Sequence, residues 1–302
     1  MHTQKPIFGH LAAFVTISIW GITFISIKIL LVDFSPAEIL FFRLVFALLA
    51  LLIVSPPQLR GAFTEGQPGS RLRLELKYMA AGLCGVTLFF MIQNTALSYT
   101  QASNVSVLLS VAPLFTALAA RVFLKDEPLK TYFFLGFALA MSGILLIAYN
   151  GSTVLKLNPL GDLLAILAAG VWALYSVLVR KISASQTNLL AVTRKTMFYG
   201  LLFLLPFLPL FHFQLGLSRL RAPLNLINLL FLGLGASALC YISWNYAVSV
   251  LGAMKTSVYI YLGPVITIVS AVLLLREKIT LVGVLGVGLI LAGMVLSERQ
   301  KT

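Results

Sequence analysis

The sequence predicts an all-α integral membrane protein with ten transmembrane helices, arranged as two inverted five-helix repeats. Three observations lead to this prediction: an apolar composition, apolar runs of membrane-spanning length along the whole chain, and a set of residues that recurs after about 150 positions. Of the 302 residues, 60% are hydrophobic and 10% are charged, and the mean hydropathy is +0.99. Soluble domains are about half apolar and a quarter charged, so the composition indicates a lipid bilayer as the solvent.

Ten apolar runs are long enough to cross a membrane, which takes about 20 residues at a rise of about 1.5 Å each. Equally long runs come after the first one, and no small-residue cleavage site with a polar mature region comes after it, so it is predicted to be a helix and not a cleaved signal. The predicted spans are 8–30, 37–54, 78–98, 103–124, 131–149, 160–179, 188–211, 224–249, 254–275 and 280–297.

Lys and Arg are unevenly distributed between the two sets of predicted loops. If the N-terminus is cytoplasmic, the inner side holds Lys5, Arg60, Arg71, Arg73, Lys77, Arg121, Lys125, Lys130, Arg180, Lys181, Lys255, Arg299 and Lys301, and the outer side holds Lys28, Lys156, Arg219, Arg221, Arg276 and Lys278. Inner loops carry the excess of positive charge in membrane proteins. Both termini are therefore predicted to be cytoplasmic, in a bacterial inner membrane. Loop anchoring accounts for the net charge of +13, and no aromatic-interleaved basic face indicates nucleic-acid binding.

Several distinctive residues recur in the same order at a nearly constant offset of 150 to 152 positions. The pairs are Trp20 and Trp172, Arg43 and Arg194, Asn94 and Asn245, Pro113 and Pro264, and Glu127 and Glu277. The predicted repeats are residues 1–150 and 151–302. Each holds five helices, an odd number, so the second copy must enter the membrane from the side opposite to the first. Many secondary transporters use such an inverted repeat to build a central site that opens alternately to each face.

These residues lie in motifs that resemble a known family. The motifs are "W-G-x-x-F" from Trp20, "F-x-R" ending at Arg43, "N-x-A-L" from Asn94, and the paired segments "PLFTALAARVFLKDEPL" and "PVITIVSAVLLLREKIT". Together they resemble the EamA-type branch of the drug/metabolite transporter superfamily over essentially the whole chain. The resemblance implies two inverted five-helix repeats, with helices one, three, four, six, eight and nine around a central cavity. Cargo in that family includes amino acids, choline, nucleotide-related metabolites and drugs, so the resemblance implies transport without specifying the substrate.

The first and sixth predicted helices carry polar and aromatic residues on limited faces. Trp20, Thr23, Trp172 and Tyr175 are candidate substrate-binding residues, because a polar face in an apolar helix usually points into the bundle or a wet cavity. Trp20 and Trp172 lie near mid-membrane, where an indole N–H needs a partner. The alternative for the hydroxyl groups, including Ser176, is a hydrogen bond to a carbonyl of the same or a neighbouring helix.

The third, eighth and ninth predicted helices add four more candidates. Asn94 and Asn245 place amides at mid-membrane, Trp244 lies next to Asn245, and Tyr259 belongs to a set of tyrosines that could form an aromatic wall. An amide at this depth is costly unless it is bonded, so each Asn either binds substrate or joins two helices. An aromatic wall suits an apolar side chain or, through its ring faces, an ammonium group.

Prolines, arginines and glycines within the predicted helices lead to three further expectations. Pro113 and Pro264 each remove a helical hydrogen bond and are predicted hinges. Arg43 and Arg194 are expected to be snorkelling or hairpin-locking cations in peripheral helices, and the alternative is a substrate ligand. Small-residue faces that include Gly136, Gly143 and Gly286 are expected to pack within the bundle or in a homodimer, so the protein is predicted to be a monomer or a weak homodimer.

The predicted function is secondary transport of a small organic metabolite by alternating access, with export of amino acids or related zwitterionic compounds as the leading case. No nucleotide-binding loop, metal cluster or cofactor motif is present, and no membrane-embedded carboxylate marks a proton or sodium site. The alternative is an integral-membrane enzyme that acts on a lipid-borne substrate. An enzyme would be expected to cluster His, Asp or Glu at one membrane face, whereas here the polar residues lie near the midplane.

Overall fold

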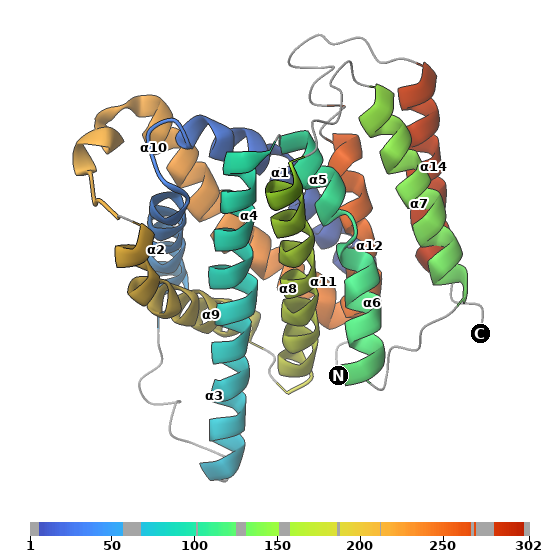
Figure 1. The fold of residues 1–302 in the computed structure, drawn as a ribbon. Helices are drawn as coiled ribbons and strands as arrows, with labels where there is room; N and C mark the ends of the chain where they lie inside the picture. The colour runs from blue at the N-terminus through green and yellow to red at the C-terminus, as the bar shows by residue number, and fades with distance from the viewer. Residues whose placement is uncertain are drawn as a thin grey trace.

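The described part of the structure is a bundle of helices (Figure 1). It is a computed structural model that describes residues 6–56, 68–100, 102–124, 131–150, 158–185, 188–211, 213–266, 269 and 281–298. Every regular element in these ranges is a helix. The all-α prediction therefore holds for the described part of the chain.

The described first half of the chain contributes eight helical segments. They are α1 (Pro6–Leu30), α2 (Pro36–Val54), α3 (Pro68–Gly82), the π-helical η1 (Leu83–Leu88), α4 (Phe89–Tyr99), α5 (Ala102–Leu109), α6 (Ala112–Phe123) and α7 (Thr131–Asn150).

The second half has a similar order of long, interrupted and short segments. They are α8 (Pro159–Ser183), α9 (Leu189–Leu204), the 3₁₀ segments η2 (Leu205–Phe211) and η3 (Leu217–Arg221), α10 (Pro223–Leu230), the π-helical η4 (Phe231–Leu239), α11 (Cys240–Leu251), α12 (Ala253–Val258), η5 (Tyr259–Tyr261) and α14 (Leu281–Glu298).

Seven of the described helical stretches are long and apolar enough to span a membrane, which makes the chain a multi-pass membrane protein. They are Pro6–Leu30, Pro36–Val54, Arg71–Tyr99, Asn104–Phe123, Pro159–Ser183, Leu189–Pro209 and Pro223–Leu251, and shorter apolar helices cover Thr131–Ile147 and Leu281–Ser297. The remaining predicted span, 254–275, lies partly outside the described residues. The count of ten spans and their inverted arrangement stay predictions.

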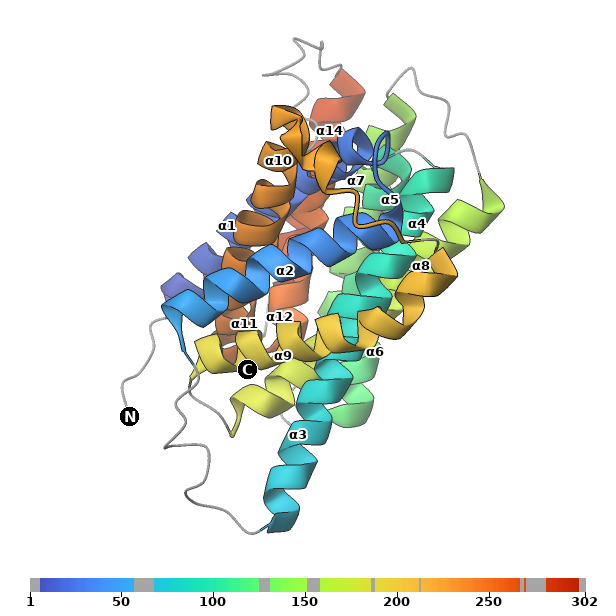
Figure 2. The same ribbon diagram turned by 90° about the vertical axis from the view of Figure 1, so that its left-hand side faces the viewer.

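Two of the long spans contain a π-helical segment. η1 continues α3 into α4, and η4 continues α10 into α11. π turns interrupt the regular hydrogen-bond ladder and occur often at functional sites. α2 lies against η4 and α9 (Figure 2), so the interruption in the second half of the chain is packed against a helix of the first half.

The predicted hinge at Pro113 lies at a helix start and not in mid-helix. α5 ends at Leu109, Ser110 and Val111 form a turn, and Pro113 occupies the first turn of α6. Proline is well tolerated there because the first-turn N–H has no helical partner. Pro264 lies in a helical stretch that the structure describes over residues 262–266.

The start of α2 is fixed by a capping box and an ion pair. The Ser35 hydroxyl accepts a hydrogen bond from the Glu38 N–H at 3.3 Å, and a Glu38 carboxylate oxygen accepts one from the Ser35 N–H at 2.8 Å. The guanidinium of Arg219 donates to both Glu38 oxygens at 3.0 Å. The bidentate pair ties the connection before α10 to the start of α2.

α7 and α14 pack against each other along their small residues, at one side of the bundle (Figure 1). A Cβ atom added to Gly143 would lie 2.5 Å from the Gly286 carbonyl oxygen, and one added to Gly136 would lie 2.5 Å from that of Gly293. The glycines therefore permit a backbone-to-backbone contact that any side chain would prevent. This is the packing within the bundle that the sequence predicted for these glycines.

This contact predicts that Gly143→Leu destabilises the protein by about 1–3 kcal/mol or more, because the new side chain must push α14 away. Thermal unfolding in detergent, followed by circular dichroism, measures the effect. Gly288→Leu is the matched control, since a Cβ atom there meets nothing within 4 Å. Equal losses of stability in both variants would show that the α7–α14 contact is not the cause.

Candidate functional site

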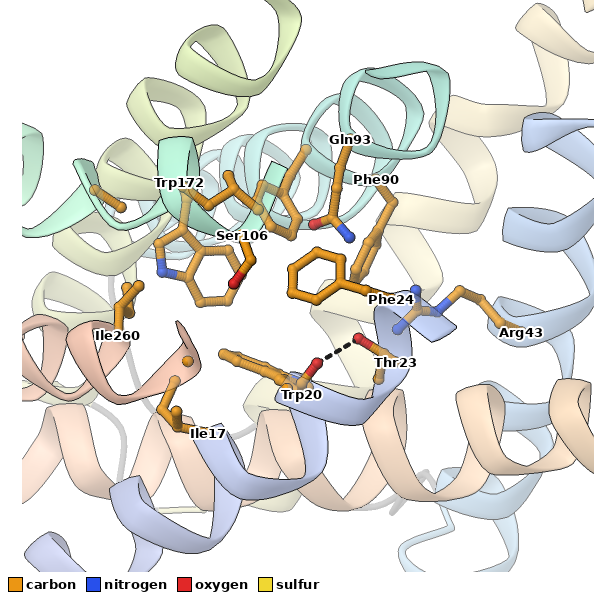
Figure 3. A pocket seen from close by; sticks show the side chains of 15 residues that line it. Ile17, Trp20, Thr23, Phe24, Arg43, Phe90, Gln93, Ser106, Trp172 and Ile260 are labelled. Carbon is orange, nitrogen blue, oxygen red and sulfur yellow. Dashed lines mark hydrogen bonds between the residues drawn. The ribbon is translucent and has the colours of Figure 1, made fainter. Parts of the chain in front are cut away.

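A cavity lies between helices from both halves of the chain, with an empty volume of about 660 Å³ that includes space open to its surroundings. The lining comes from α1, α2, α4, α5, α6, α8, η5 and the turn of helix after η5. The lining residues are Ile17, Trp20, Gly21, Thr23, Phe24, Arg43, Phe89, Phe90, Gln93, Ser106, Leu109, Ala112, Trp172, Ile260 and Gly263 (Figure 3). Three predicted site residues, Trp20, Thr23 and Trp172, are among them.

The two predicted tryptophans meet edge to face in the cavity wall. The ring centroids of Trp20 and Trp172 are 5.1 Å apart, at an interplanar angle of 85°. Phe89 packs on Trp172 at 4.7 Å, and Trp244 lies behind both tryptophans, 5.2 Å from Trp20 and 5.6 Å from Trp172. Aromatic pairs in such geometries form rigid apolar surfaces. The wall therefore suits the apolar part of a small molecule.

Carbonyl groups of the two π turns accept hydrogen bonds from aromatic side chains near the cavity. The Trp20 indole donates to the Ala236 carbonyl in η4 at 2.8 Å, and the Tyr241 hydroxyl donates to the Gly85 carbonyl in η1 at 2.5 Å. Gly85 and Ala236 are 151 positions apart, the offset of the sequence repeat. The two π turns therefore each supply a carbonyl acceptor for an aromatic side chain near the cavity, and the two carbonyls lie at equivalent positions of the repeat.

The indole N–H of Trp172 has no partner among the described residues, although Trp172 is only 3% exposed. A buried donor without an acceptor is costly, and at a cavity wall a ligand can supply the acceptor. The Trp244 indole N–H is also unpaired within the described chain, but Trp244 is not part of the described cavity lining. Trp172 therefore presents the unpaired indole donor of the cavity wall.

Thr23 both lines the cavity and bonds a carbonyl of its own helix, the two roles that the sequence left open. Its hydroxyl donates to the Trp20 carbonyl at 2.7 Å (Figure 3), and its side chain lines the cavity. Ser176 donates in the same way to the Trp172 carbonyl at 3.1 Å. The Thr23 oxygen keeps its capacity to accept a hydrogen bond.

Tyr175 and Asn245 belong to a buried network that joins three helices. The Tyr175 hydroxyl donates to the Asn245 side-chain oxygen at 2.7 Å, and the Asn245 amide donates to the Thr193 hydroxyl at 3.0 Å. All three residues are fully buried, and none is in the described lining of the cavity. The network connects α8, α11 and α9. Asn245 therefore joins helices, which is the alternative to substrate binding that the sequence left open.

Asn94 and Tyr259 lie close to the cavity but outside its described lining. The Asn94 amide donates to the Pro36 carbonyl at the start of α2 at 3.3 Å, and its side-chain oxygen is buried without a partner among the described residues. The neighbour of Asn94, Gln93, lines the cavity instead. The Tyr259 hydroxyl lies 2.6 Å from the His10 ring and links η5 to α1.

Arg43 lies in the cavity wall, and the expectation of a snorkelling, peripheral cation is wrong for it. The side chain is 1% exposed, its Nε donates to the Ser237 hydroxyl at 2.8 Å, and its Cζ lies 3.8 Å from the Phe90 ring centroid. A snorkelling cation would reach the aqueous boundary. Arg194, by contrast, binds the Ser55 carbonyl at the end of α2.

Acidic side chains do not contribute to the described lining of this cavity. In the described ranges, His, Cys, Asp and Glu form no group of three or more that could hold a metal ion. The chemistry that the lining offers is therefore apolar contact, hydrogen bonding and one guanidinium charge.

Comparison with known proteins shows the family of this chain. The sequence matches the EamA-like transporter family over residues 7–149 and again over residues 159–298. An uncharacterized transporter of Archaeoglobus fulgidus is 30% identical over 97% of this chain and 98% of its own length. A protein of Streptantibioticus cattleyicolor named "Probable terminal-alkyne amino-acid exporter" is 29% identical over 96% of this chain and 93% of its own.

The fold also has a counterpart among solved structures. One crystal structure of a protein that is 17% identical superposes with a TM-score of 0.71 and covers 95% of each chain, which is a likeness of fold alone. The family match covers both halves of the chain, and the relatives are named transporters and not enzymes. The chain belongs to the EamA-like transporter family.

Proposed function

We propose that this transporter is a secondary carrier that exports small zwitterionic metabolites, with amino acids as the leading class, by alternating access. The observation that carries the proposal is the cavity between the two halves of the chain, walled by Trp20 and Trp172 and holding an indole donor that is unpaired in the described chain. Apolar walls with a few convergent polar groups are typical of small-molecule sites.

An inverted repeat is supported by matched helix caps in the two halves. The Lys28 ammonium of α1 donates to carbonyls at the end of α4, among them that of Thr100 at 2.8 Å. Arg180 of α8 donates to the Ser249 carbonyl near the end of α11 at 3.0 Å. The two cations are 152 positions apart, and cations at helix C-termini are favourable. The two family matches along the chain support the same duplication.

Alternating access requires places where helices can bend. The π turns η1 and η4 and the break before α6 at Ser110 and Val111 lie beside the cavity and interrupt helices that would otherwise be rigid. Pro264 lacks the N–H that a regular helix would use at its position, and Pro113 begins α6 directly after the break. We assign the hinges to these segments.

The cavity chemistry favours a zwitterion with an apolar body over a sugar phosphate. A phosphate group needs several convergent cationic donors, and Arg43 is the one cation in the described lining. Trp20, Phe24 and Trp172 offer ring faces to an apolar side chain or an ammonium group. The name of the Streptantibioticus relative, an amino-acid exporter, supports this cargo and the outward direction.

We further propose the topology that the loop charges predict, with both termini in the cytoplasm of a bacterial cell and the chain working as a monomer or a weak homodimer in the inner membrane. The small-residue faces of α7 and α14 pack against each other within one chain, which supports the monomer.

The topology predicts that a single cysteine at Ser152 reacts with a membrane-impermeant maleimide added to intact cells, while one at Gln67 does not. Both positions lie in predicted loops outside the described residues. The parent for these variants replaces Cys84 and Cys240, both free thiols. Permeabilised cells should label both positions equally. Preferential labelling at residue 67 in intact cells would reverse the orientation.

The cavity predicts that Trp172→Phe lowers flux of the preferred amino acid by about 2- to 10-fold without lowering thermal stability. The variant removes an indole donor that no described protein group uses, while the aromatic wall remains. Proteoliposomes loaded with a panel of amino acids, amines and nucleosides provide the assay.

Two variants serve as controls. Trp20→Phe should lower stability as well as flux, because it removes the bond to the Ala236 carbonyl. Trp244→Phe removes an indole donor that no described group accepts from and that lies outside the described lining, so it should lower the flux less than Trp172→Phe does. Unchanged flux in Trp172→Phe, or a panel in which only phosphorylated compounds are carried, would refute the proposed site.

A further inference from the structure

We infer that Arg43 binds the carboxylate of the cargo, so that the cavity selects a small monocarboxylate with an apolar body over the corresponding neutral amide. The inference rests on the proposed function and assigns the group through which the cargo is recognised. The main observation that supports this inference is the position of the Arg43 guanidinium.

The guanidinium of Arg43 is held on two sides. Its Nε donates to the Ser237 hydroxyl of η4, and its Cζ lies over the ring of Phe90 of α4. One terminal nitrogen, Nη2, is buried and has no hydrogen-bond partner in the described chain. Figure 3 shows the end of this side chain next to Thr23, Phe24 and Phe90, at one end of the cavity. The protein thus fixes the orientation of the fork and leaves Nη2 without an acceptor in the described chain.

Arg43 also has no acidic partner among the described residues. The described ion pairs join Glu38 to Arg219 and Glu75 to Lys195, and all four residues lie outside the cavity lining. A buried cation inside a membrane is costly unless it is paired. A carboxylate that enters the cavity supplies the missing charge and accepts from the free nitrogen in the planar geometry that arginine favours.

The rest of the lining accommodates the other parts of such a molecule. The Trp172 indole, unpaired in the described chain, can donate to a second acceptor, and Gln93 and Ser106 add polar atoms to the same wall. Trp20 and Phe24 provide the apolar surface. With one guanidinium in the described lining, a single carboxylate balances the charge, whereas a dianion leaves one charge unpaired.

A purely structural role for Arg43 is the competing explanation. Its bond to Ser237 ties α2 to η4, and this contact alone could account for a buried arginine. That role uses Nε and leaves Nη2 without a function. It also predicts that loss of Arg43 weakens all ligands equally, whereas carboxylate binding predicts that only ligands with a carboxylate are affected.

The test measures binding of three probes to the purified full-length protein in detergent: L-phenylalanine, L-phenylalaninamide and N-acetyl-L-phenylalanine. The amide lacks the carboxylate, and the N-acetyl compound keeps it but lacks the ammonium. Quenching of tryptophan fluorescence gives the affinities. The wild-type protein should bind the acid about 10- to 100-fold more tightly than the amide, the range expected for a charged hydrogen-bonded pair. The N-acetyl compound should bind more tightly than the amide.

In Arg43→Gln, affinity for both carboxylate probes should fall by about 10- to 100-fold, while affinity for the amide changes by less than about threefold. Arg43→Lys keeps the charge without the planar fork and should keep part of the preference, so it serves if the Gln variant does not fold. Arg194→Gln is the matched control, because it removes the arginine at the equivalent repeat position, outside the described cavity lining. It should leave the acid-to-amide ratio unchanged.

The outcomes separate this inference from the proposed function. Equal affinity of the wild-type protein for acid and amide, or an undiminished acid preference in both Arg43 variants, overturns the role of Arg43 while amino-acid transport stands. A wild-type protein that binds no probe and carries no amino acid of the vesicle panel overturns the proposed function, and the inference with it.

Discussion

Hydrocarbon offers no hydrogen-bond partner, so every polar group inside this bundle must find one in the protein, in water or in a ligand. Many find it in the protein. Lys28 and Arg180 cap helix ends, Glu38 binds its own helix start and Arg219, and Asn245 lies in a closed network with Tyr175 and Thr193. In the described cavity wall, Trp172 and Arg43 each keep a donor without an acceptor. These two unused donors at one cavity are the reason why we propose that a ligand binds there.

The spans could be predicted from the sequence because membrane thickness sets the length of an apolar run. The prediction of 8–30 corresponds to Pro6–Leu30, and that of 160–179 to Pro159–Ser183. The helix that holds the third predicted span, 78–98, begins earlier, at Pro68. Its polar first turns extend beyond the part that hydropathy identifies. The π turns η1 and η4 could not be predicted, because they arise from packing against other helices and not from local composition.

Part of the lining of the candidate cavity could be predicted from the sequence, for reasons that differ between residues. Trp20 and Trp172 were identified because indole groups at mid-membrane need a partner, and the structure brings them together. The direction of Arg43 was missed, because α2 is apolar on all sides and its sequence gives no indication of which face points inward. Asn245 and Tyr175 look like ligand-binding residues in the sequence, and only the structure shows that Tyr175 donates to Asn245, which in turn donates to Thr193.

The two π-turn carbonyls accept from different donors, and this difference affects the balance between conformations. In a carrier built from two identical inverted repeats, exchanging the conformations of the halves would give inward-open and outward-open states of equal free energy. Here Ala236 accepts from an indole and Gly85 accepts from a phenol, while the Trp172 indole has no acceptor in the described chain. One hydrogen bond corresponds to about 1 kcal/mol, or about a fivefold ratio of populations. In the alternating-access cycle that we propose, this mismatch would favour one of the two states, so the empty carrier would rest more often on one side of the membrane.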